Sequence, residues 1–113
     1  MRVLKGTTTF NGVKLSKTGG QHGTDLFYAD PERAQMGGSV MGVVFSAPKA
    51  KTVYVAGDTV WRPEVDQALA QHKPDVVILN TGSALVSGFE EHPIIMGKQD
   101  TLQATKSAPK AAI

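Results

Sequence analysis

Short apolar segments separated by turn residues occupy the first half of the chain, and their spacing predicts β-strands. Residues 3–10 and 13–17 read as two extended segments on either side of Asn11-Gly12. This dipeptide favours the positive φ angles of a two-residue hairpin turn, because both residues tolerate the left-handed region. The chain is therefore predicted to open with a β-hairpin.

Polar and apolar residues alternate in the return strand of this hairpin. Val13 and Leu15 alternate with Lys14 and Ser16. Because successive side chains of a strand point to opposite faces of the sheet, the first pair is predicted to point inward and the second outward. The strand is thus expected to be half exposed.

Two more apolar segments predict a second hairpin. Residues 38–45 and 52–56 are extended, and the Pro48–Lys51 segment between them reads as a turn. Residues 25–36, which precede this hairpin, have mixed polarity and are expected to form a short helical turn or a lid.

Helical spacing first appears after residue 60. Pro63 suits the first turn of a helix, where its missing N–H costs nothing. Apolar residues then recur at i, i+3 and i+4 from Val65, and Lys73-Pro74 is predicted to end the helix.

The last third of the chain is predicted to return to a strand and then to a second helix. Residues 75–80 form a continuous apolar strand, predicted to be buried on both faces, and residues 81–93 read as a loop. Residues 97–107 are predicted to be a short helix, and residues 110–113 the opening of another strand. The order predicts a single α/β domain over residues 1–113, and the apolar ending leads us to expect a chain that is cut rather than complete.

Composition narrows the function classes. Apolar residues make up 41% of the chain and charged residues 19%, which is ordinary for a globular domain. The net charge of +2 is too small to favour nucleic acid as a partner. Without cysteine, a metal site has to use histidine and carboxylate ligands. The apolar segments are too short to span a membrane, and we expect a cytoplasmic protein.

Two loops carry the residues that suggest chemistry. Asp58 follows a buried strand and a glycine, and His22 lies on a loop with several glycines. Our hypothesis is that both belong to one metal site, because loops at the carboxyl ends of strands converge on one crevice. In the alternative, Asp58 caps the following turn and His22 is solvated. His72 is expected near a helix C-terminus, and His92 in a solvated loop.

Three motifs taken in order give the chain a family resemblance. Thr18-Gly19-Gly20-Gln21-His22-Gly23, Val55-Ala56-Gly57-Asp58-Thr59 and Val77-Ile78-Leu79-Asn80-Thr81-Gly82 resemble metallo-β-lactamase-fold hydrolases. The closest likeness is to the branch with ascorbate-phosphate lactonase-like and phospholipase D-like members. The resemblance covers nearly the whole chain but only about the C-terminal half of the family's domain.

The resemblance implies a fold, a cofactor and an activity. The fold would be part of an αββα sandwich, a mixed sheet with helices packed on one side. His22 would be the loop histidine ligand of the first metal, and Asp58 would bridge two metals, with Zn or Mn as the divalent ion. The activity would be hydrolysis of a small-molecule ester, lactone or phosphodiester.

The chain also departs from the family. It has no His-x-His-x-Asp-His motif, and the last histidine ligand would follow residue 113. We therefore expect weak metal binding and no efficient hydrolysis by the isolated chain. An apolar sheet face should pair with the missing half-domain or with another copy of the chain. The alternative function is a non-catalytic, degenerate homologue or an oligomerising interaction module.

Overall fold

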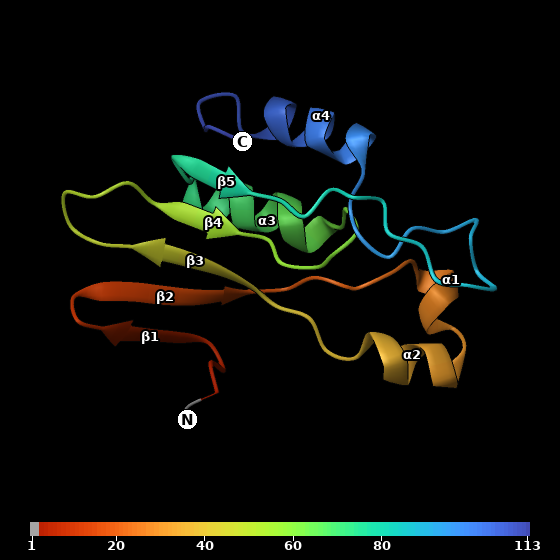
Figure 1. The fold of residues 1–113 in the computed structure, drawn as a ribbon. Helices are drawn as coiled ribbons and strands as arrows, with labels where there is room; N and C mark the ends of the chain where they lie inside the picture. Colours follow the sequence, from red (N-terminus) through yellow and green to blue (C-terminus); the bar gives the residue numbers. More distant parts are fainter. Residues whose placement is uncertain (1–2) are drawn as a thin grey trace.

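The computed structural model, which describes residues 3–113, shows a five-stranded sheet with helices beside it (Figure 1). The strands lie side by side in chain order, and neighbours are antiparallel except for the last pair, which is parallel. They are β1 (Thr7–Phe10), β2 (Val13–Thr18), β3 (Gly42–Ser46), β4 (Val53–Val55) and β5 (Val76–Ile78). The mixed α/β class predicted from the sequence is confirmed.

Four helices are present among the described residues, in two pairs. The first pair, α1 (Asp25–Tyr28) and α2 (Pro31–Gly37), lies at one end of the sheet (Figure 1). These two short helices form where a short helical turn or a lid was predicted. The second pair, α3 (Pro63–His72) and α4 (Lys98–Ser107), agrees with the predicted helices. Within residues 3–113, no helix is long and apolar enough to cross a membrane.

The first hairpin forms as its turn dipeptide predicts. Asn11 and Gly12 have φ angles of 47° and 79°, both in the left-handed region that this turn requires. β1 and β2 pair from Phe10 and Val13 outward, directly on either side of the turn.

One face of the sheet packs against α3 and forms the core. A row of paired residues crosses this face from Ser16 through Val44 and Tyr54 to Val77, and all four are buried. The expectation that Ser16 points to solvent is therefore wrong. Alternation separates the two faces of a strand but does not say which one a helix covers. Here α3 covers the face of Ser16, and its apolar side completes the core with Val65, Ala68 and Leu69.

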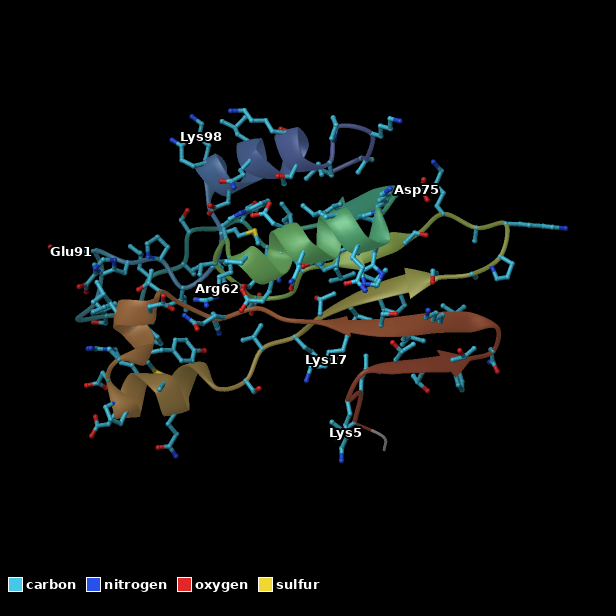
Figure 2. All side chains as sticks on the ribbon, turned by 180° about the vertical axis from the view of Figure 1, so that it is seen from behind. Lys5, Lys17, Arg62, Asp75, Glu91 and Lys98 are labelled. Atoms are coloured by element: carbon cyan, nitrogen blue, oxygen red, sulfur yellow. The ribbon has the colours of Figure 1, made fainter. Side chains whose placement is uncertain are left out.

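The opposite face of the sheet is mainly apolar, and no helix among residues 3–113 lies over it (Figures 1 and 2). Its apolar side chains on β2 to β5 are half-buried, except that Ile78 is 47% exposed. β5 is therefore not buried on both faces as predicted, because only the α3 side is covered. Cross-strand pairing places these apolar residues on one surface, called the open face below: Val13, Leu15, Val43, Phe45, Val53, Val55, Val76 and Ile78. The exposed Lys17, which pairs with Val43, lies on the same face.

The end of the chain makes one further pairing with the sheet. Ala112 forms an isolated parallel bridge with Val76 of β5, where a strand had been predicted to open. The backbone N–H of Val77 donates to the carbonyl oxygen of Ala112 at 2.8 Å. Residues 110–113 therefore lie along the edge of the sheet beyond β5.

Candidate functional site

Three loops meet at one end of the sheet because three strands run in the same direction. β2 and β4 both pair antiparallel with β3, and β5 is parallel to β4, so these strands share a direction (Figure 1). His22 follows β2 by four residues, Asp58 follows β4 by three, and Asn80 follows β5 by two. In layered α/β folds, ligands bind at this end of the strands.

Hydrogen bonds fasten the His22 loop to the Asp58 loop. The backbone N–H of Gln21 donates to Thr59 Oγ1 at 2.9 Å, and the N–H of Val60 donates to the carbonyl oxygen of Gln21, also at 2.9 Å. The Thr59 hydroxyl donates in turn to the carbonyl oxygen of Val60 at 2.8 Å, and Thr59 is completely buried. Each candidate ligand is thus one residue away from this contact, called the Gln21–Thr59 clasp below.

Two glycines beside His22 are needed for this loop conformation. A Cβ atom on Gly20 would lie 3.0 Å from Thr59 Oγ1, so a larger residue would push the clasp apart. Gly23 has a φ of 130°, and a Cβ atom there would lie 2.9 Å from the Phe27 ring. A side chain at either position would therefore separate the loop from Thr59 or from α1.

Asp58 is exposed and is oriented by a neighbouring amide. Asn80 Nδ2 donates to Asp58 Oδ1 at 2.6 Å, which joins the loops that follow β4 and β5. Asp58 does not cap α3, whose N-cap is Arg62. An amide that fixes one carboxylate oxygen and leaves the other free is typical of the surroundings of metal ligands.

An ion pair adds a second connection between the first two loops. Arg62 Nη1 lies 2.6 Å from Asp25 Oδ1, and Arg62 Nε lies 3.2 Å from Glu64 Oε2. Hydrogen bonds from Gln21 and from Arg62 hold the pKa of Asp25 below its usual range. The hydrogen bond to Asp25 also raises the pKa of Arg62, so both groups remain charged at neutral pH.

Within the described residues, His22 and Asp58 are the two candidate ligands. Within residues 3–113, no group of three or more His, Cys, Asp or Glu side chains is arranged to hold a metal ion. His72 lies in the last turn of α3, as expected. His92 stacks against Phe89 with 5.0 Å between ring centroids, so it is part of an aromatic cluster and not only a solvated loop residue.

The residues that hold the loops together are ones that sequence reasoning did not select. Gln21 and Thr59 each lie beside a candidate ligand, and Asn80 lies in a motif that was noted without a role for its side chain. Their partners are 38 and 22 positions away in the chain, and no local pattern gives such pairings. The only available signal was the placement of all three just beyond strands.

Comparisons with known proteins place the chain among homologues of metal-dependent hydrolases. It is 36% identical over its whole length to the UPF0173 protein YddR of Bacillus subtilis (strain 168), of which it spans 42%. It is 34% identical over 77 residues to a UPF0173 metal-dependent hydrolase of Ruegeria pomeroyi, covering 68% of this chain and 32% of that protein. No protein-family model matches the chain.

Solved structures show the same fold at higher identity. One is a possible metal-dependent hydrolase from Veillonella parvula, with a TM-score of 0.93 and 45% identity over 97% of this chain and 42% of that one. Another is an isothiocyanate hydrolase from Delia radicum gut bacteria, with a TM-score of 0.90 and 44% identity over 97% of this chain and 43% of that one. The chain therefore spans less than half the length of these relatives.

Proposed function

We propose that this chain is part of a metal-dependent hydrolase of the metallo-β-lactamase superfamily. In this proposal His22 is a ligand of the first metal, and Asp58 bridges two divalent ions, Zn or Mn. The substrate is a small molecule with an ester, lactone or phosphodiester bond. A divalent ion in such a site lowers the pKa of a bound water and polarises the bond to be cleaved.

The observation that carries this proposal is the Gln21–Thr59 clasp. It holds the loops of His22 and Asp58 side by side, although the two residues are far apart in the sequence. Asn80 orients the Asp58 carboxylate from the third loop. Relatives named a metal-dependent hydrolase and a possible metal-dependent hydrolase support a divalent metal in general.

The two candidate ligands of this chain are of types that bind divalent ions, but two ligands are too few for a complete site. Imidazole nitrogen and carboxylate oxygen are ligands that Zn²⁺ and Mn²⁺ both accept. A catalytic zinc site commonly uses three protein ligands, whereas no group of three or more His, Cys, Asp or Glu side chains within residues 3–113 is arranged to hold a metal ion. We therefore propose that the remaining ligands come from polypeptide outside these 113 residues, and that the isolated chain binds metal weakly and hydrolyses inefficiently.

Replacing Asp58 with alanine tests the ligand assignment. We expect Asp58→Ala to weaken Zn²⁺ binding by the 113-residue chain about tenfold or more, because one of two ligands is lost. His22→Ala should weaken binding to a similar extent. Isothermal titration calorimetry at neutral pH measures both affinities, with His72→Ala, in the last turn of α3, as the matched control. Metal retention in Asp58→Ala equal to that of the unaltered chain would end the assignment.

The open face favours a second candidate function, an oligomerising interaction module. The eight apolar side chains of the open face share one sheet surface, and contiguous apolar surface of this kind marks interaction sites when it is large. In this alternative, a second copy of the chain packs its own open face against the first, as in an isologous dimer.

The oligomeric state separates this alternative from a monomeric fragment. If the open face mediates dimerisation, Ile78→Asp should convert a dimer to a monomer in sedimentation velocity. Leu102→Asp is the matched control, because Leu102 is about equally exposed but lies on α4. A monomeric unaltered chain, or an Ile78→Asp variant that remains dimeric, would rule out dimerisation through this face.

A further inference from the structure

A pocket of about 570 Å³ opens beside the candidate metal site, and its walls continue the three converging loops. Thr24 lies two residues beyond His22, Val60 two residues beyond Asp58, and Ser83 three residues beyond Asn80. Consecutive Cα atoms are about 3.8 Å apart, so the Cα atoms of Thr24 and Val60 lie within about 8 Å of those of the candidate ligands. The volume is in the range of small-molecule sites.

The inner wall of the pocket is apolar and contains one fixed aromatic side chain. Val60, Trp61, Pro93 and Ile95 supply carbon surface. Trp61 Nε1 donates to Asp66 Oδ2 at 3.0 Å, which satisfies the only polar atom of the indole and holds the ring in place. A flat apolar group is the complement of such a wall.

The pocket lining carries two carboxylates and two cations, and of the cations only Lys98 is outside an ion pair with a described residue. Asp25 is paired with Arg62, and Asp100 Oδ2 accepts a hydrogen bond from the N–H of Gly97 at 2.8 Å. Among residues 3–113, Lys98 forms no ion pair, and it lines the pocket at the first residue of α4. Figure 2 shows Arg62 and Lys98 at the same end of the molecule, where α3 and α4 begin. The formal charges of the lining therefore balance, and Lys98 is the cation available to an anionic group.

We propose that this pocket binds an organic anion with a flat apolar body, its carboxylate near Lys98 and its body against Trp61. In the assembled hydrolase this would be the part of the substrate that does not react. That assignment of role rests on the proposed function, whereas the binding of such an anion by this chain does not.

Trp61 makes the proposal directly measurable, because it is the only tryptophan of the chain. Phenylacetate is the probe, titrated while the Trp61 emission is recorded. We expect a saturable change, with weaker binding of phenylethanol, which lacks the charge, and of acetate, which lacks the ring. Lys98→Ala should weaken phenylacetate binding about threefold to fivefold, the range of an exposed ion pair. Lys106→Ala, at the other end of α4, is the matched control and should bind as the unaltered chain does.

The outcomes separate the pocket from the metal site. Asp58→Ala should bind phenylacetate normally, because Asp58 is not among the residues that line the pocket. The absence of a saturable Trp61 response would overturn the pocket proposal and leave the metal ligands untouched. So would equal phenylacetate affinity in Lys98→Ala and the unaltered chain. Loss of Zn²⁺ binding without loss of phenylacetate binding is the expected behaviour of Asp58→Ala.

Discussion

Replacing Gly42 with alanine should destabilise the fold by about 3 kcal/mol, the upper part of the range for overpacking a filled interior. Gly42 opens β3 and is buried between β2 and β4. A Cβ atom there would lie 2.8 Å from the carbonyl oxygen of Val55 and 3.0 Å from that of Ala56, and it would also meet the Thr18 hydroxyl. These carbonyl oxygens belong to the last residue of β4 and to the residue after it. They cannot move aside without shifting the segment that leads to Asp58.

Urea unfolding followed by circular dichroism measures this loss, and Gly6→Ala is the matched control. A Cβ atom on Gly6 would have no neighbour within 4 Å, so the same substitution there should change stability by less than about 0.5 kcal/mol. Equal midpoints for the two variants would contradict the close approach of Gly42 to the backbone of β4.

Thr59→Val should destabilise the fold by about 2 kcal/mol and loosen the candidate metal site. Valine keeps the shape of threonine but removes the hydroxyl that accepts from the N–H of Gln21 and donates to the carbonyl oxygen of Val60. A buried donor left without a partner costs about 1–3 kcal/mol. Because this hydroxyl is half of the Gln21–Thr59 clasp, Zn²⁺ binding should weaken together with stability.

Thr8→Val is the control for the substitution itself, since it makes the same change at an exposed threonine of β1. Loss of a solvent-exposed hydroxyl on a strand should change stability by less than about 0.5 kcal/mol. Amide hydrogen exchange at Gln21 provides a local measurement and should accelerate in Thr59→Val only. Similar exchange in both variants would show that the Thr59 hydroxyl does not hold the loop.

Local sequence signals predicted the helices and strands of this fold. Long-range contacts determined which face of each strand is buried. The Asn11-Gly12 turn and the helix from Pro63 follow from neighbouring residues alone, and both form as predicted. The orientation of Ser16 does not, because it depends on which face of the sheet α3 covers. The same reason explains the exposure of Ile78, which an apolar segment by itself predicts to be buried.

In the candidate site, too, the local features were predicted from the sequence and the long-range contacts were not. Residue type and placement after a strand identified His22 and Asp58, and the topology brings their loops to one end of the sheet. The contacts that fix those loops, from Gln21 to Thr59 and from Asn80 to Asp58, join distant positions and were not predicted. The pocket beside them is built from several loops, so it too could be found only in three dimensions.

The Gln21–Thr59 clasp has a consequence for the order of events during folding. Its hydrogen bond joins residues 38 positions apart, so it can form only after β2, β3 and β4 have associated. Contacts of such separation cost loop-closure entropy and are made after local turns and helices. In a chain emerging from the ribosome, the loops of the two candidate ligands would therefore not be held side by side until most of the sheet exists. Any metal ion that binds between these loops would then be recruited after the sheet has formed.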